Sequence, residues 1–223
     1  MQPSIIIPVL NEAPNLPSLS TQLAPLVQAG AEVLFVDGGS TDGTPNLAGS
    51  AGFRTIRSAR GRARQMNAGA KAARGDLLIF LHADTVLPGE ALAAIADALR
   101  RGHAWGRFDV RIAGRPWMLR VVAQMMNRRS RLTGIATGDQ AMFMIRETFE
   151  LVGGFPDQPL MEDIEMSRRL RAHSRPACLR LKVTTSGRRW ESRGVWRTIL
   201  LMWRLRWDYW RGVPANTLAE AYR

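Results

Sequence analysis

The chain has 223 residues, 46% of them apolar and 22% charged, with a formal net charge of +12. This composition is typical of a folded globular protein and excludes a disordered basic tail. The single cysteine, Cys178, excludes an internal disulfide framework and a cysteine-based zinc knuckle, and it favours a cytoplasmic location. Residues 1–100 carry 8 basic and 8 acidic side chains, whereas residues 101–223 carry 23 and 11, so the whole excess lies in the second half. Such a surface favours nucleic acid, an anionic membrane or a phosphate-bearing substrate as partner.

The first hundred residues alternate between β-rich apolar runs and helical patterns. Strands are predicted at 4–10, 32–37, 53–57 and 76–81, and helices at 16–26, at 65–73 and after Pro88. This order predicts an α/β fold with a mostly parallel, doubly wound sheet and flanking helices. Ligands of such sheets bind at the carboxyl ends of the strands. The run at 5–7 is broken by Pro8 and no stretch of 18 apolar residues occurs, so neither a signal peptide nor a transmembrane helix is expected.

The second half is less regular. Strands are predicted at 104–112 and 141–145, and helices at 116–127, 162–172 and 195–210. We expect one domain over residues 1–190 and an amphipathic helical extension over residues 191–223. Tryptophans and arginines alternate along this extension, which predicts contact with an anionic membrane face, with the domain itself or with a second subunit in a homodimer. The tryptophans are expected to cover more than one face of the helix, which slightly favours packing on protein.

Three acidic constellations follow predicted strands or turns. Asp37 ends a strand and opens a glycine-rich turn, where a carboxylate accepts hydrogen bonds from a ligand or simply caps the turn. His82 and Asp84 are two residues apart at a strand end, so both side chains point the same way and suit a divalent cation, or they are an ordinary strand end and helix cap. Glu162 and Asp163 begin a helix, where the dipole suits a general base and where capping acids are also common.

Basic residues surround two of these segments. Arg60, Arg62, Arg64 and Lys71 flank Asn67, and Arg189 precedes Trp190 further along the chain. Guanidinium groups bind phosphate oxygens in bidentate fashion, although arginines in a run often form only a solvated face. The sequence lacks the phosphate loop GxxxxGK[ST], the GxGxxG fingerprint, an HExxH helix and the GxSxG elbow of serine hydrolases.

Taken in order, these segments resemble the family 2 glycosyltransferases, which are inverting enzymes with the GT-A nucleotide-diphospho-sugar fold. The resemblance rests on SIIIPVLNE (4–12), VDGGSTDGT (36–44), GRARQMNAGAKAARGDLLIFLHADT (61–85), GGF (153–155) and ED (162–163). The ending SGRRWESRGVWRT resembles a small bacterial subgroup associated with radical-SAM and selenoprotein-type gene neighbourhoods. The resemblance implies a single-domain, GT-A-type transferase that uses Mn²⁺ or Mg²⁺.

The resemblance also implies roles for individual residues. Asp84 is expected to hold the metal and the sugar diphosphate, and Asp163 to act as catalytic base with Glu162 beside it. Asp37 is expected to accept a hydrogen bond from the nucleotide base. Arg64 is expected to contact the nucleotide base or the diphosphate, and His82 to contact ribose, metal or neither. The remaining donor-side residues implied are Pro8, Asn11, Glu12 and Asn67, and those on the acceptor side are Asp139, Gln140, Arg189 and Trp190.

Three departures from the family pattern refine the expected activity. Gly38 stands where many members have a second aspartate, His82 replaces the first aspartate of D-x-D, and Ser186 replaces the glutamine of the Q-x-x-R-W of processive synthases. We therefore expect transfer of a single sugar to an acceptor hydroxyl. The acceptor is unknown, a lipid or lipid-linked molecule being one candidate, and the expected location is the cytoplasm or the inner face of the membrane. The alternatives are a sugar-1-phosphate nucleotidyltransferase, whose glycine-rich basic signature is absent, and a basic RNA-binding protein, which leaves the acidic motifs unexplained.

Overall fold

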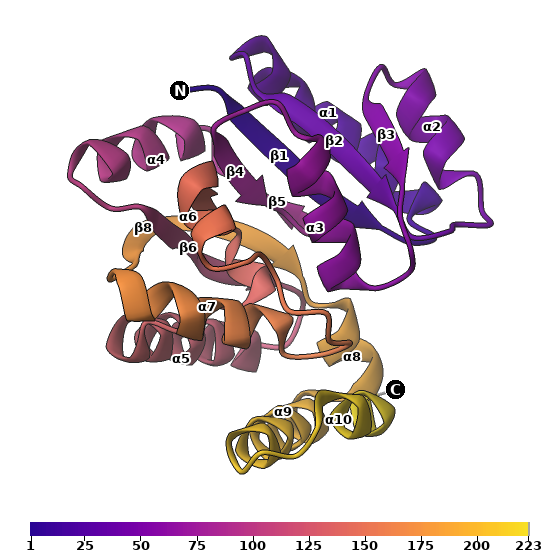
Figure 1. Cartoon of the computed structure of the whole chain (residues 1–223). Helices are drawn as coiled ribbons and strands as arrows, with labels where there is room; N and C mark the ends of the chain where they lie inside the picture. Colours follow the sequence, from indigo (N-terminus) through magenta and orange to yellow (C-terminus); the bar gives the residue numbers. More distant parts are fainter. Residues whose placement is uncertain (223) are drawn as a thin grey trace.

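A computed structural model describes residues 1–222 and shows a twisted sheet covered by helices on both faces (Figure 1). The first half alternates strands and helices as predicted. The strands are β1 (Pro3–Val9), β2 (Glu32–Asp37), β3 (Arg54–Arg57) and β4 (Leu77–Phe80), and the helices are α1 (Leu16–Gln28), α2 (Thr44–Ser50) and α3 (Arg62–Ala72), with a short 3₁₀ turn η1 (Ala13–Asn15). Helix α2 was not given a range by the sequence because its seven residues show no helical period.

The second half completes the sheet. It contains β5 (Thr85–Val86), α4 (Ala91–Arg100), β6 (Trp105–Ala113), α5 (Met118–Thr133), the 3₁₀ turn η2 (Gly138–Gln140), β7 (Met142–Ile145), α6 (Arg146–Leu151), α7 (Glu162–His173) and β8 (Ala177–Ser186). Within the described residues the strand order is β3-β2-β1-β4-β7-β6-β8-β5. The pairs β1–β2, β2–β3, β1–β4 and β6–β8 are parallel, which confirms the mostly parallel sheet. Strand β7 runs antiparallel to both of its neighbours.

Two apolar layers sandwich the sheet, and β1 shows why its sequence is continuously apolar. Ile5 and Ile7 belong to the core beneath α1, whereas Ile6 between them packs on the opposite face with Met66 of α3. A strand buried on both faces needs apolar side chains at every position. This burial fixes the carboxyl ends of β1, β2 and β4 at one edge of the sheet, where the predicted donor residues begin.

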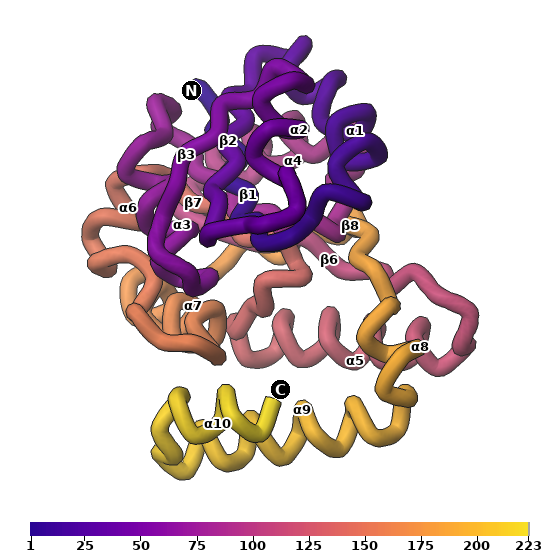
Figure 2. Tube along the Cα trace, turned by 90° about the vertical axis from the view of Figure 1, so that its right-hand side faces the viewer, coloured from indigo at the N-terminus to yellow at the C-terminus, as the bar shows by residue number. Residues whose placement is uncertain are grey.

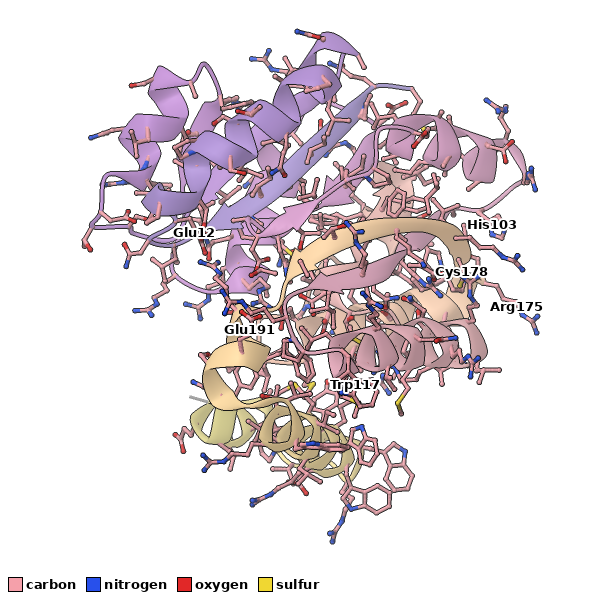
Figure 3. The ribbon with its side chains drawn as sticks, turned by 180° about the vertical axis from the view of Figure 1, so that it is seen from behind. Glu12, His103, Trp117, Arg175, Cys178 and Glu191 are labelled. Atoms are coloured by element: carbon pink, nitrogen blue, oxygen red, sulfur yellow. The ribbon has the colours of Figure 1, made fainter. Side chains whose placement is uncertain are left out.

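The C-terminal segment forms α8 (Arg188–Arg193), α9 (Val195–Trp210) and α10 (Ala215–Tyr222). Figure 2 shows α9 and α10 beneath α5 and α7, on the side of these helices away from the sheet. A small apolar cluster of Met161, Leu205 and Leu218 joins the α9–α10 hairpin to the start of α7. The backbone N–H of Arg115 donates to Glu191 Oε1 at 2.8 Å, so α8 is tied to the loop before α5 (Figure 3).

The expectation that the tail tryptophans cover several faces is wrong. Large apolar side chains that are 57–76% exposed recur along α9 at Trp196, Leu200, Trp203, Trp207 and Trp210. At 3.6 residues per turn these positions fall within about 80° of the helix circumference. We call these five residues the tryptophan stripe. The opposite side of α9 packs on protein through Leu205, so the helix has one packed face and one apolar face in solvent.

Among residues 1–222, no helix is both long enough and apolar enough to cross a membrane.

Candidate active site

A cleft of about 580 Å³ opens at the carboxyl ends of the strands. It is bounded by the end of β1, the start of α3, the loop after β4, the turn η2 and helix α8. The structure brings seven of the predicted site residues to this cleft, namely Pro8, Glu12, His82, Asp84, Asp139, Arg189 and Trp190. The lone Cys178 lies far from Glu12 at another edge of the molecule (Figure 3), so it takes no part in this site.

Asn11 and Asp37 do not line the cleft, and their side chains shape its loops. Asn11 Oδ1 accepts from the backbone N–H of Thr41 at 2.9 Å, which joins the loop after β1 to the loop after β2. The Asp37 carboxylate is fully buried and accepts from the backbone N–H groups of Gly39 and Ser40 at 3.0 and 3.1 Å. These bonds hold the turn after β2, and the predicted contact of Asp37 with the nucleotide base stays a prediction.

Gln65 explains the glycine at position 38. Its side-chain amide is buried and donates to the carbonyl oxygens of Val9 and Val36 at 2.8 and 2.7 Å. A Cβ at Gly38 would come within 3.0 Å of the Gln65 side chain. A residue larger than glycine at this position therefore conflicts with the glutamine that joins β1 and β2 at the cleft floor.

Arg64, Asn67 and Gln140 also lie outside the cleft. Arg64 Nε pairs with Asp157 Oδ1 at 2.8 Å on the surface. Asn67 exchanges two hydrogen bonds with the backbone of Phe155, donating at 2.8 Å and accepting at 2.9 Å, and so holds the glycine turn before α7. Gln140 is fully buried and forms a capping box with Thr137. Their predicted ligand contacts stay predictions, while the structure gives each of them a bond that positions a loop.

Asp84 offers a carboxylate suited to a divalent cation. Among residues 1–222, this carboxylate accepts a long hydrogen bond of 3.4 Å from the Thr85 hydroxyl, and Arg189 lies within electrostatic reach of it. No cluster of three or more His, Cys, Asp or Glu side chains with metal-binding geometry occurs among residues 1–222. Mg²⁺ and Mn²⁺ are commonly held by one or two carboxylates together with substrate phosphates and water. Asp84 therefore fits a metal whose remaining ligands come from a bound diphosphate.

His82 lines the same cleft as Asp84. Its Nδ1 lies 3.3 Å from Asp139 Oδ1, and its buried Nε2 has no hydrogen-bond partner within residues 1–222. Gly138 lies directly against the ring, because a Cβ at that position would be 2.3 Å from Nε2. The imidazole thus faces η2 with both nitrogens, and its contact with a metal stays a prediction.

Three arginines, Arg60, Arg62 and Arg189, line the cleft beside the carboxylates of Glu12, Asp84 and Asp139. Arg62 Nη1 lies 3.3 Å from Glu162 Oε1, and Arg189 stacks over the Tyr222 ring with 3.9 Å to the centroid. Burial lowers the pKa of Arg189, and repulsion from Arg193 and Arg62 lowers it further. An anion placed between neighbouring guanidinium groups reduces their mutual repulsion, and a bound diphosphate would act in this way.

Asp163 lies in the first turn of α7 and lines a small pocket that shares Arg62 and His82 with the cleft. Its carboxylate accepts from the backbone N–H groups of Gly138 and Ile164, both at 2.8 Å. Burial raises the pKa of Asp163 to about 6, and the charge of Glu162 adds to this rise against the opposing hydrogen bonds and Arg62. A carboxylate with a pKa near 6 is ionised at neutral pH yet basic enough to accept a proton.

Backbone strain and the C-terminal helices supply features that the sequence did not reveal. Among residues 1–222, the non-glycine residues with positive φ are Asn11, Ala141 and Met161, and each lies in a loop beside the site. Such conformations cluster at functional sites because the surrounding packing must hold them.

Thr198, Met202 and Tyr222 of α9 and α10 also line the cleft. The sequence predicted the helix of the tail and slightly favoured its packing on protein, but it did not place these residues at the cleft.

The sequence profile of the family described as Glycosyl transferase family 2 matches residues 4–150, about two thirds of the chain. This chain belongs to glycosyl transferase family 2. A curated relative, the undecaprenyl-phosphate 4-deoxy-4-formamido-L-arabinose transferase of Aeromonas hydrophila subsp. hydrophila, is 27% identical over 148 residues. That match covers 61% of this glycosyltransferase and 45% of the relative, so the chain spans about half the length of the relative it matches.

Solved structures confirm the GT-A-like fold of this family 2 glycosyltransferase. The 1–349 portion of S. aureus TarS in complex with UDP superposes with a TM-score of 0.68 at 18% identity, covering 83% of this chain and 60% of that portion. The mannosyltransferase PcManGT of Pyrobaculum calidifontis, in complex with GDP-Man and Mn²⁺, gives 0.62 at 22% identity, covering 82% of this chain and 56% of that enzyme. The expected fold and enzyme class are confirmed, which removes the nucleotidyltransferase and RNA-binding alternatives from consideration.

Proposed function

We propose that this glycosyltransferase is metal-dependent and inverting, and that it moves a single sugar from a nucleotide-diphosphate sugar to an acceptor hydroxyl. The observation that carries the proposal is the arrangement of two carboxylates: Asp84, which lines the cleft and has no salt-bridge partner among the described residues, and Asp163, whose pKa is raised. Arg62 lines both the cleft and the pocket that contains Asp163. The first suits a metal and diphosphate, and the second suits a proton acceptor.

The residues present divide the reaction between them. As the acceptor oxygen attacks the anomeric carbon, the bond to the diphosphate breaks and its electron pair goes to the β-phosphate oxygen. Asp163 takes the acceptor proton, and Arg62 and Arg189 stabilise the charge that develops on the leaving diphosphate. Attack from the face opposite the leaving group inverts the anomeric centre. A divalent cation held by Asp84 supplies further neutralisation of that charge when bound.

The donor side is proposed to use Pro8 and Glu12 in direct contact and Asn11 and Asp37 to hold the surrounding loops. Solved relatives bind UDP or GDP-Man, which supports a uridine or guanosine diphosphate sugar as donor. A panel of UDP- and GDP-sugars, each with Mn²⁺, Mg²⁺ or EDTA, tests this by release of the nucleoside diphosphate. We expect one donor class to be hydrolysed slowly and only with metal. Absence of release and of any thermal shift across the whole panel would overturn the proposal.

The acceptor is proposed to be a lipid or lipid-linked molecule at the inner face of a membrane. The curated relative is named for undecaprenyl phosphate, and the tryptophan stripe of α9 suits an interface because indoles favour the boundary between lipid and water. Arginines beside the stripe suit anionic headgroups. The division into a domain over 1–190 and an extension over 191–223 is kept in this proposal, as is the radical-SAM-associated subgroup that the segment SGRRWESRGVWRT resembles.

Vesicle co-sedimentation tests the membrane contact. The double variant Trp203→Ser/Trp207→Ser removes two stripe residues that are 59% and 57% exposed, and Leu151→Ser removes an equally exposed apolar residue on α6 as a control. We expect the unaltered chain and the control to pellet with vesicles containing anionic lipid, and the double variant to remain in the supernatant. Equal pelleting of the double variant and the control would contradict the contact.

A further inference from the structure

The imidazole of His82 packs on the turn η2. The residue follows β4, and only 14% of its side chain is exposed. A Cβ built at Gly138 would lie 2.3 Å from Nε2 and 2.5 Å from Cε1, far closer than van der Waals contact allows. Gly138 does not have positive φ, so the histidine ring, and not the backbone conformation, requires a glycine there.

The same glycine binds the proposed catalytic base. The backbone N–H of Gly138 donates to Asp163 Oδ2 at 2.8 Å. Two residues earlier, the backbone N–H of Ala136 donates to the Ser167 hydroxyl of α7 at 3.1 Å. The segment before η2 is therefore hydrogen bonded to α7 at two points. Gly138 itself contacts Asp163 through its N–H and His82 through its α-carbon side, so one residue links the imidazole to the carboxylate.

The rest of η2 fixes the position of the ring. His82 Nδ1 lies 3.3 Å from Asp139 Oδ1, so the imidazole is paired with the residue that follows Gly138. The capping box between Thr137 and the fully buried Gln140 stabilises the turn from within. A turn held in this way is expected to move as a unit, so loss of the imidazole should displace the N–H that Asp163 accepts.

We propose that His82 is a positioning residue, whose imidazole holds η2 so that the N–H of Gly138 stays on the carboxylate of Asp163. The inference rests on the proposed function, in which Asp163 takes the acceptor's proton. It adds that the orientation of this base depends on a residue two positions before the proposed metal ligand, Asp84. A hydrogen bond to the ionised carboxylate fixes its orientation and favours its charged form.

His82→Ala separates positioning from metal binding. We expect kcat to fall roughly 10- to 100-fold, because a misplacement of about 1 Å in a catalytic group costs that much. The Mn²⁺-dependent gain in affinity for the nucleoside diphosphate should stay unchanged in a calorimetric titration. His103→Ala is the control, since His103 lies at another edge of the molecule, far from Glu12 at the cleft (Figure 3). Loss of the Mn²⁺-dependent gain in His82→Ala would make His82 a metal ligand and overturn the inference.

A double-mutant cycle tests the contact between the ring and the glycine. Gly138→Ala places a methyl group where the imidazole lies, so it should lower kcat by a factor similar to that of His82→Ala. In the His82→Ala background the methyl group has room, and the same substitution should cost less than about threefold. Gly89→Ala is the control, because a Cβ at Gly89 has nothing within 4 Å. Losses that multiply in the double variant would contradict the contact.

The ionisation of Asp163 gives a readout that needs no donor. Burial raises the pKa of Asp163 to about 6 although the N–H of Gly138 lowers it, so both His82→Ala and Gly138→Ala should raise this pKa further. Gly138→Ala retains the imidazole, so a rise shared by both variants comes from the displaced N–H. The other charged groups that face this carboxylate are the same in all these variants, namely Glu162, Arg62 and Arg129. Carbon NMR of isotope-labelled aspartates, assigned with Asp163→Asn, measures the pKa, and an unchanged value in both variants would overturn the inference.

These measurements separate the inference from the proposal on which it rests. If no donor releases nucleoside diphosphate, or if Asp163→Asn leaves kcat unchanged, the proposed function fails, and the NMR titration still decides whether His82 holds the Gly138 N–H on Asp163. If Asp163→Asn lowers kcat while His82→Ala and Gly138→Ala leave it intact, the catalytic base stands and the positioning role of His82 fails.

Discussion

The two sides of the active site use their polar side chains in different ways. On the donor side, Asn11, Asp37 and Gln65 donate to or accept from backbone groups of neighbouring loops and so hold these loops in place. On the proposed acceptor side, burial and the charge of Glu162 raise the pKa of Asp163. The three donor-side residues therefore stabilise the structure around the cleft, whereas Asp163 offers a carboxylate suited to take up a proton. Substitutions of these loop-holding residues should act mainly on stability, substitution of the proposed metal ligand Asp84 on nucleotide binding, and substitution of Asp163 on catalysis.

The largest effect is expected at the catalytic base. The N–H groups of Gly138 and Ile164 donate to different oxygens of Asp163, so Asp163→Asn keeps one of these two bonds and cannot take up a proton. We expect kcat to fall roughly 10²- to 10⁴-fold, the usual contribution of a general base, with nucleotide affinity nearly unchanged. Steady-state rates and calorimetric titration with the nucleoside diphosphate and Mn²⁺ measure the two quantities.

Asp157→Asn is the matched control, because Asp157 is 62% exposed and pairs with Arg64 away from the cleft. It should leave both rate and affinity intact. If Asp163→Asn reduced affinity and kcat by equal factors, Asp163 would belong to the donor site and the contrast between the two sides would collapse.

The next effect concerns metal. Asp84→Ala removes the carboxylate that we assign to the cation, so Mn²⁺ should no longer strengthen nucleotide binding. We expect the Mn²⁺-dependent gain in affinity to drop by at least about 10- to 100-fold, since even outer-shell partners of metals are worth that much. Titrations with Mn²⁺ and with EDTA measure this gain. An undiminished gain in the variant would remove Asp84 from the metal site.

The pH dependence sharpens the role of Asp163. The proton acceptor must be ionised, and its pKa in the folded protein is raised to about 6, so kcat/KM should fall about tenfold per unit as pH decreases below 6 and level off above it. Glu162→Gln removes a neighbouring negative charge, which should lower the pKa of Asp163 and move this fall in kcat/KM to lower pH. Rates at fixed ionic strength from pH 4.5 to 8 test both statements, and a limb that moves upward in Glu162→Gln would contradict the assignment.

The sequence predicted the sheet well because its signals are local. The continuous apolar runs of β1 and β2 can be read directly, since strands buried on both faces carry little else. Strand β8 escaped notice because Arg180 and Lys182 interrupt its apolar pattern, and its partner β6 lies some 70 residues earlier in the chain. Pairing over such a separation leaves no local trace.

The residues of the cleft could be predicted in part, because their signals are also local. Glu12, Asp84, Asp139 and Arg189 reach the cleft because each lies at a strand end or turn that the fold brings to one edge. Asn67 and Arg64 share the same motif but turn to Phe155 and Asp157, which are distant in sequence. The exposure of the tryptophan stripe depends on which face of α9 meets Met161, and the sequence of the helix alone does not determine that choice.

The smallest effect on activity is expected at Asp37. In Asp37→Asn the amide retains one acceptor oxygen for the N–H groups of Gly39 and Ser40 but brings an N–H that has no acceptor there. We expect the free energy of unfolding to fall by about 1–3 kcal/mol, because a buried hydrogen-bonding group is left unsatisfied. Urea denaturation measures this loss against Asp97→Asn on the surface of α4, while nucleotide affinity should change by no more than about twofold, near the resolution of such an assay. Unchanged stability together with a large loss of affinity would mean that Asp37 contacts the base in the complex and that the donor side, too, is completed by its ligand.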